Sequence, residues 1–262
     1  MGITLYKNAD WILTVNEKRE KFRHGDLLIS GKEILDVGND LEKKYAGKLQ
    51  IDKTIEAKGT VILPGFVNIH HHTWQSLIRN IQATRGLKLE PWLTVMYEIY
   101  KDLNTDVARA GVYSGLGDML KTGCTTSNDL WYPHPVGVKY LVDAEIQAAA
   151  EIGIRFHPTR GFHSVPSDIV PPEVVDTKES VTEDTIRLVK KYHDRSRFSM
   201  CQVGIAPSIA QYETEDIIEA VVDLAEEYDI MVHGHLAESQ HEVEYTLKTW
   251  GCRPFEWFKR HR

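Results

Sequence analysis

The segment Val67-Asn68-Ile69-His70-His71-His72 decides the fold, together with the preceding residues Ile62-Leu63-Pro64-Gly65-Phe66. This apolar run is interrupted by Pro-Gly and ends in His-x-His, which is typical of a buried strand with a functional end. Side chains alternate between the two faces of a strand, so His70 and His72 share one face and His71 should be structural on the other. Two neutral imidazoles on one face can bind a transition metal, with Zn²⁺ as the first expectation and Fe²⁺ as the alternative.

A second apolar run, residues 230–236, also ends in His-x-His. His233 and His235 share a face, so alternation alone does not choose between them. Position nearer the end of the strand favours His235 as the third ligand, and His233 would then support the site from one layer deeper. Three histidines leave one coordination position open for water, whose pKa a bound zinc lowers towards about 7.

Other polar residues near these runs are candidates for catalysis and substrate binding. The plainest role for Glu238 is a carboxylate at a helix N-terminus, but its spacing from His235 favours a proton shuttle. Gln75 and Arg160 are candidate substrate contacts, although either could instead stabilise a loop. Possible walls of the pocket are Trp92, Trp131 and His163, although packing in the core is the safer expectation for each of them.

Composition excludes several classes of protein. With 42% hydrophobic and 26% charged residues, the 262-residue chain has the composition of an ordinary globular protein. Its net charge of -7 argues against a nucleic-acid partner. The sequence shows neither a membrane-spanning run nor the pattern of a signal peptide, so we expect no membrane partner. Three widely spaced cysteines favour reduced thiols and a cytoplasmic location.

The pattern along the chain predicts two domains. Residues 1–60 predict part of a β-sandwich domain, with short strands at 3–6, 11–15, 26–29 and 33–37. Residues 61–262 alternate between strands and helices, which predicts a parallel sheet. The expected strands are 61–70, 124–130, 154–160, 198–206 and 230–236, and the expected helices are 104–121, 138–152, 182–193, 214–228, one from 239, and 254–260. We therefore expect an α/β fold of the (β/α)₈ TIM-barrel type, with only about five βα units present. Both histidine pairs fall at the C-terminal ends of strands, where such barrels form their active sites.

Three segments resemble the metal-dependent amidohydrolase superfamily, in the branch of cytosine and guanine deaminases and triazine hydrolases. These segments are Pro64-Gly65-Phe66-Val67-Asn68-Ile69-His70-His71-His72, Thr122-Gly123-Cys124-Thr125-Thr126 and His235-Leu236-Ala237-Glu238. The run from His70 to Arg79 is most similar to the 8-oxoguanine deaminase group. The similarity covers essentially the whole chain.

The resemblance implies a mononuclear zinc aminohydrolase acting on an aminated N-heterocycle such as a purine, pyrimidine or pterin. It assigns the metal to His70, His72 and His235, the proton shuttle to Glu238 and a substrate contact to Gln75. In the mechanism that it implies, zinc-bound hydroxide attacks the amidine carbon, the glutamate protonates the ring nitrogen, and ammonia leaves. Residues 198–206 contain no lysine, unlike the binuclear branch with its carbamylated lysine.

Two departures leave the heterocycle open. Pro207-Ser208 stands where many of these deaminases have Pro-His or Pro-Cys, and Leu130-Trp131-Tyr132-Pro133 differs from the usual 8-oxoguanine pattern. An s-triazine chlorohydrolase or aminohydrolase is therefore an alternative within the superfamily.

Family members also continue with a histidine on strand six and an aspartate on strand eight. We therefore expect this chain to be C-terminally truncated, and a non-catalytic fragment or pseudo-enzyme is the alternative of another class. Five strands cannot close a barrel, so we expect apolar sheet edges to be exposed and the isolated chain to fold poorly or aggregate. For the full-length protein we expect a homo-oligomer.

Overall fold

The computed structural model describes residues 2–261, which divide into two compact units, Met1–Gly65 and Phe66–Arg262. The division falls at Pro64-Gly65, a few residues after the boundary predicted at residue 60. Within the described range, no helix has both the length and the apolar character needed to cross a membrane.

The first unit is a five-stranded sheet with the order β3-β2-β1-β4, in which β5 also pairs with β1. The expected strands 3–6 and 11–15 form one continuous strand, because a register shift between Tyr6 and Ala9 accommodates Asn8 at a φ of 60°. Leu5, Leu28 and Leu41 form its small buried core. The elements are β1 (Ile3–Leu13), β2 (Lys21–Ser30), β3 (Glu33–Gly38), α1 (Leu41–Tyr45), β4 (Lys53–Glu56) and β5 (Val61–Ile62).

The predicted strand 61–70 is divided between the two units, which corrects the sequence-based expectation. Val61–Ile62 (β5) pairs with β1, whereas Phe66–Asn68 (β6) pairs with β7 of the second unit. Pro64 separates the two halves because proline has no N–H to donate to a ladder. His70, His71 and His72 consequently follow the end of β6.

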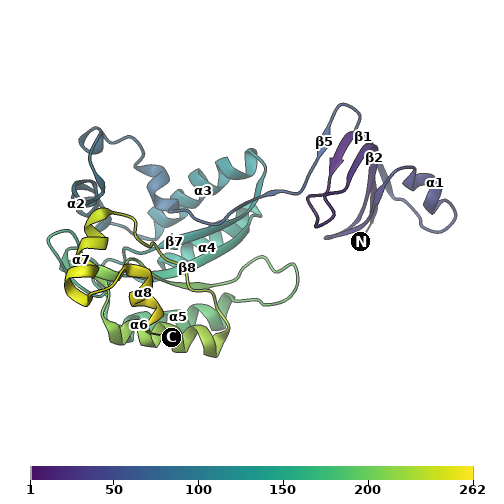
Figure 1. Ribbon diagram of the computed structural model, residues 1–262. Helices are drawn as coiled ribbons and strands as arrows, with labels where there is room; N and C mark the ends of the chain where they lie inside the picture. The colour runs from purple at the N-terminus through teal and green to yellow at the C-terminus, as the bar shows by residue number, and fades with distance from the viewer. Residues whose placement is uncertain (1, 262) are drawn as a thin grey trace. The chain divides into compact units, whose positions relative to one another are not determined.

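The second unit is built on a curled parallel sheet with the order β6-β7-β8-β9. Helices follow the strands as predicted, and α3, α4, α5 and α6 pack against the sheet (Figure 1). Helix α2 was not predicted from the sequence. The elements are β6, 3₁₀ turns η1 (Thr73–Leu77) and η2 (Gln82–Thr84), α2 (Leu89–Tyr100), α3 (Thr105–Lys121), β7 (Cys124–Trp131), α4 (Leu141–Ile152), β8 (Arg155–Phe162), η3 (Pro172–Val174), α5 (Lys178–Tyr192), β9 (Gly204–Pro207), η4 (Ala210–Tyr212), α6 (Glu215–Tyr228), α7 (Gln240–Trp250) and α8 (Pro254–Lys259).

The last two predicted strands are shorter than expected, for identifiable reasons. The strand predicted over 198–206 is reduced to Gly204–Pro207 and an isolated bridge of Cys201 to Phe156, and Phe198 is excluded by its φ of 66°, which no extended strand accommodates. The segment 230–236 pairs with β9 through a single bridge between Ile205 and Val232. The ladder cannot continue beyond this bridge because Pro207 has no N–H to donate to the next carbonyl.

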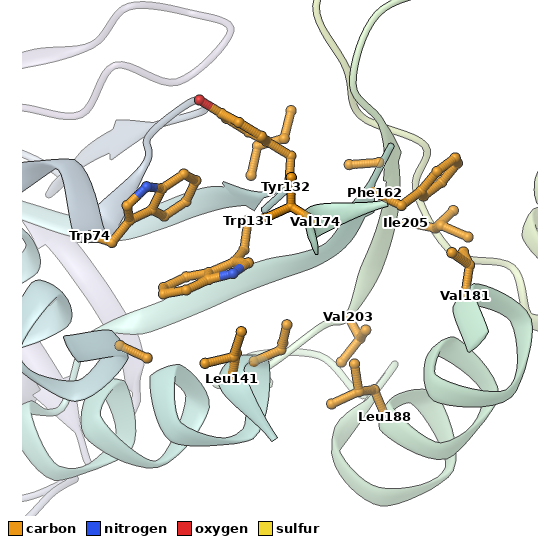
Figure 2. Close-up of a cluster of buried hydrophobic side chains, with 14 of the residues drawn as sticks. Trp74, Trp131, Tyr132, Leu141, Phe162, Val174, Val181, Leu188, Val203 and Ile205 are labelled. Atoms are coloured by element: carbon orange, nitrogen blue, oxygen red, sulfur yellow. The ribbon is translucent and has the colours of Figure 1, made fainter. Parts of the chain in front are cut away.

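The core of the second unit lies between the sheet and its helices. Figure 2 shows Trp131 and Leu141 on the helix side of the strands, and Leu188 of α5 facing Val203. Trp74 packs against Trp131 with ring centroids 4.6 Å apart. This packing anchors η1, the turn that directly follows the three consecutive histidines.

Candidate metal centre and the adjoining cavity

His70, His72 and His235 come together at the C-terminal edge of the parallel sheet. Each offers one ring nitrogen, and the three nitrogens lie within 4.8 Å of one another. His70 and His72 follow β6, whereas His235 follows the segment that bridges to β9. Carboxyl ends of parallel strands meet at one edge, so residues 163 positions apart along the chain become neighbours.

Backbone carbonyls orient two of these rings. The Nδ1 of His72 lies 2.7 Å from the Leu130 carbonyl oxygen, and that of His235 lies 3.2 Å from the Ser208 oxygen. A carbonyl oxygen only accepts, so each Nδ1 carries the proton and each Nε2 keeps its lone pair. The two Nε2 atoms face each other at 3.1 Å. Two such lone pairs repel unless a cation lies between them, so the donor set fits a metal ion.

The protonation state of the cluster suits metal binding. Burial lowers the pKa of His72 far below its usual value, and burial followed by the charge of His70 lowers that of His235 to about 4. Both rings are therefore neutral at pH 7, which is the form that binds metal. The pKa of His70 is lowered by partial desolvation as well.

The neighbouring histidines contact the cluster from other sides. The Nε2 of His233 lies 2.7 Å from the Nδ1 of His70, and the two rings stack with centroids 5.0 Å apart. His71 turns away from the cluster and its Nδ1 accepts the backbone N–H of His72 at 2.7 Å. His233 therefore orients His70, and His71 restrains the backbone of His72.

A cavity of about 300 Å³ adjoins His72 and His235. Trp92 and His163, two of the predicted walls, line it, whereas Trp131 is buried in the core instead. The Gln75 amide nitrogen donates to the hydroxyls of Tyr100 at 3.1 Å and Tyr132 at 3.3 Å. The amide oxygen of Gln75 has no partner among residues 2–261, so it remains available as an acceptor.

The tyrosines of this cavity were not predicted from the sequence. Its remaining lining residues include Tyr97, Tyr132 and Tyr212. Tyr97 belongs to α2, where Leu93, Met96, Tyr97 and Tyr100 are buried on one face. Their three-and-four spacing was the signal that could have revealed the helix.

Glu238 lies at the rim of the cavity. Its side chain is exposed, yet partial desolvation, followed by the charges of Glu242 and Glu90, raises the pKa of its carboxyl group. The backbone N–H of Glu238 donates to Glu242 at 2.8 Å, and Ser239 caps the helix that follows. A carboxyl group with a raised pKa beside a candidate metal centre is suited to accept and return a proton.

Arg160 does not line the cavity beside His72 and His235, and its role as a substrate contact stays a prediction. Its buried guanidinium pairs with Asp176 at 2.7 Å and with Asp184 at 3.0 Å. It lines a separate cavity of about 530 Å³ to which none of the cluster histidines contributes. Strand alternation explains the difference, because Arg160 and the core residue Phe162 share the helix-facing side of β8.

Comparison with known proteins gives consistent matches. A sequence model of the amidohydrolase family matches residues 61–257. The 8-oxoguanine deaminase of Pseudomonas aeruginosa is 31% identical over 242 residues, covering 90% of this chain and 54% of that protein. A 5-methylthioadenosine/S-adenosylhomocysteine deaminase of Bacillus cereus is 30% identical over 255 residues, covering 97% of this chain and 54% of that protein.

A solved structure is similar over nearly the whole of this chain. Atrazine chlorohydrolase TrzN from Arthrobacter aurescens TC1, complexed with zinc, superposes with a TM-score of 0.88 at 24% identity, covering 98% of this chain and 58% of that one. At this identity the likeness concerns the fold, and it confirms the predicted α/β barrel type. The chain spans about half the length of the curated relatives that it matches.

Proposed function

The chain belongs to the amidohydrolase family, and from this membership we propose that it is a metal-dependent aminohydrolase. The reaction would release ammonia from an aminated N-heterocycle such as a purine, pyrimidine or pterin. The observation that carries the proposal is the pair of facing Nε2 atoms of His72 and His235, each freed by a carbonyl bond to its Nδ1. The deaminase names of two relatives support the same reaction class.

His70, His72 and His235 would hold one divalent ion. Zn²⁺ is our first choice because it prefers three imidazoles with one position left open, and zinc accompanies the similar TrzN structure. When bound, the ion would lower the pKa of water and so supply a nucleophile at neutral pH.

Glu238 would move the protons of the reaction. As a carboxylate at the cavity rim it can accept a proton, and as a carboxylic acid it can deliver that proton to a ring nitrogen or to the departing amine. Its raised pKa brings the protonated form closer to neutral pH than in an ordinary glutamate.

The cavity wall would select a flat, polar substrate. Trp92, Tyr97 and Tyr132 offer aromatic surface for a planar ring, and the free amide oxygen of Gln75 can accept an N–H of that ring. Gln75 would therefore favour heterocycles that present an N–H donor to its amide oxygen.

We further propose a cytoplasmic location and self-association. Cys124, Cys201 and Cys252 are free, which suits a reducing compartment. Exposed apolar residues at the sheet edges supply surface for contacts between copies.

An assay of the zinc-loaded protein with aminated purines, pyrimidines and pterins, and with a chlorinated s-triazine, tests the proposal. We expect ammonia release from at least one aminated heterocycle, and loss of both zinc and activity in His72→Ala. His157→Ala is the matched control, because His157 lies in β8 outside the cluster. Chloride release without ammonia release would instead favour a triazine chlorohydrolase, and unchanged zinc binding in His72→Ala would refute the metal site.

A further inference from the structure

Glu213 is a buried carboxyl group to which the sequence analysis gave no role. It follows the 3₁₀ turn η4, and its side chain is completely shielded from solvent. Its Oε1 accepts the backbone N–H of Ser208 at 3.1 Å, and its Oε2 accepts the hydroxyl of Ser164 at 2.8 Å. Glu213 therefore ties together the loops that follow β8 and β9.

The residue that Glu213 holds through its N–H, Ser208, is also the one whose carbonyl orients His235. The carbonyl oxygen of Ser208 accepts the backbone N–H of His235 at 2.9 Å and lies 3.2 Å from the Nδ1 of the same residue. One backbone oxygen thus fixes both the main chain and the ring of His235. Because β9 ends at Pro207, regular strand pairing no longer holds the backbone of Ser208 in place.

The other neighbours of Glu213 do not compete for this contact. The Nδ1 of His163 lies 3.9 Å from Oε1, beyond hydrogen-bond range, and the other nitrogen of that ring contacts the hydroxyl of Tyr97. The hydroxyl of Ser164 engages the other carboxyl oxygen and in turn accepts the N–H of Thr214 at 2.9 Å. Oε1 is thus committed to the Ser208 peptide.

We propose that Glu213 is a positioning residue for His235, an inference that rests on the proposed metal site. By holding the N–H of Ser208 it directs the Ser208 carbonyl at Nδ1 of His235, which keeps the proton on Nδ1 and leaves Nε2 free for the ion. Partners of this kind around metal-binding histidines commonly change metal affinity by about 10–100-fold when they are removed. Glu213 reaches the histidine through a backbone peptide rather than by direct contact.

The first experiment records the tautomer of His235 in the metal-free wild-type protein by long-range ¹H–¹⁵N NMR, with His235→Gln used to assign the signal. We expect the form with the proton on Nδ1. In Glu213→Ala the population should shift towards the form with the proton on Nε2. An Nε2-protonated His235 in the wild-type protein would overturn the proposal, whether or not any variant folds.

The second experiment measures Zn²⁺ affinity by competition with a chromophoric chelator. Glu213→Ala should bind zinc about 10–100-fold more weakly. Glu213→Gln should retain the wild-type affinity, because its amide oxygen can accept from Ser208 and its amide nitrogen can donate to the Ser164 hydroxyl. Ser164→Ala is the matched control: it removes the other contact of Glu213 and should also retain the affinity.

The variants separate the possible outcomes. Equal losses in Ser164→Ala and Glu213→Ala would indicate general loosening of the loops and would overturn the positioning role. Unchanged affinity and tautomer in a folded Glu213→Ala protein would overturn it as well. If His72→Ala leaves zinc affinity unchanged, the proposed metal site fails instead, and the tautomer measurement still decides whether Glu213 orients His235.

Discussion

At the scale of single residues, backbone carbonyls determine which nitrogen each histidine offers. Leu130 and Ser208 accept from the Nδ1 atoms of His72 and His235, and burial keeps both rings neutral. The cluster is therefore prepared for a cation by hydrogen bonds and desolvation.

Glu238 is the residue for which the clearest effect on turnover is expected. Glu238→Gln should lower kcat by about 10²–10⁴-fold, because the amide cannot carry the proton, while zinc affinity stays unchanged. Steady-state kinetics of the zinc-loaded variant, combined with metal titration, check this. Glu244→Gln, an exposed change in the same region, is the control and should behave as the wild type. Full activity of Glu238→Gln would exclude the shuttle role.

At the scale of elements, a buried pair of carboxyl groups joins β7, α4 and η1. Asp129 accepts the backbone N–H of Thr73 at 2.6 Å, and Glu145 accepts the hydroxyl of the same threonine. Thr73 directly follows His72, so this hydrogen-bonded network of Asp129, Glu145 and Thr73 fixes the end of the candidate metal-binding segment. It was not predicted from the sequence, because its three members come from separate elements.

This network predicts that the stability of the protein falls as pH rises above the acidic range. Burial raises the pKa of Asp129 to about 8 and, with the charge of Asp129, raises that of Glu145 well above its usual value. An aspartate in the unfolded chain titrates near about 3.9, so between these values the folded state binds more protons and the free energy of unfolding falls as pH rises.

Asp129→Asn should remove the contribution of Asp129 and leave only that of Glu145. From about pH 5 to pH 8 the wild type should lose stability relative to the variant, by at most about 1.4 kcal/mol per pH unit. Urea unfolding at several pH values measures the difference. Parallel stability curves for the two proteins would contradict the assignment.

Two of the three glycines in helix α3 have opposite expected responses to alanine. A Cβ on Gly111 would lie 2.8 Å from the Trp74 backbone, whereas a Cβ on Gly117 would meet nothing within 4 Å. Gly111→Ala should therefore destabilise the protein by about 1–3 kcal/mol through overpacking against η1. Gly117→Ala, the matched control, should stabilise it by about 0.5–1 kcal/mol. Urea denaturation of both variants checks the pair, and equal responses would contradict close packing at Gly111.

At the scale of the whole molecule, both outer edges of the parallel sheet carry exposed apolar side chains. Phe66, Val67 and Ile69 lie along β6 and its end, and Met231, Val232 and Leu236 lie in the opposite edge segment. Their exposure agrees with the expectation that the sheet is not closed. Unpaired strand edges of this kind can form hydrogen bonds with strands of other chains.

We therefore predict that the 262-residue chain self-associates through these edges. The double variant Val67→Lys and Val232→Lys should shift it towards monomer, because charged side chains oppose edge pairing. Sedimentation velocity over a range of protein concentrations measures the change. Val15→Lys, at a more exposed valine of the first unit, is the control. A monomeric wild type with a cooperative thermal transition would contradict the prediction.

The sequence alone determined the order of strands and helices apart from α2, the parallel sheet, and the shared face of His70 and His72. These features follow from local periodicity, which each segment carries within itself. Position in the sequence favoured His235 and Glu238, the family resemblance assigned them the same roles, and the family match confirms that resemblance.

Only the tertiary structure decided which side chains meet. It placed Arg160 in an ion-pair network, brought Glu213 to the Ser208 peptide, and joined Asp129 to Glu145 through Thr73. It also divided the run 61–70 between two units and ended the pairing of 230–236 at Pro207. The physical reason is that periodicity reports which face a residue occupies, whereas partners distant in sequence depend on how strands, loops and helices pack.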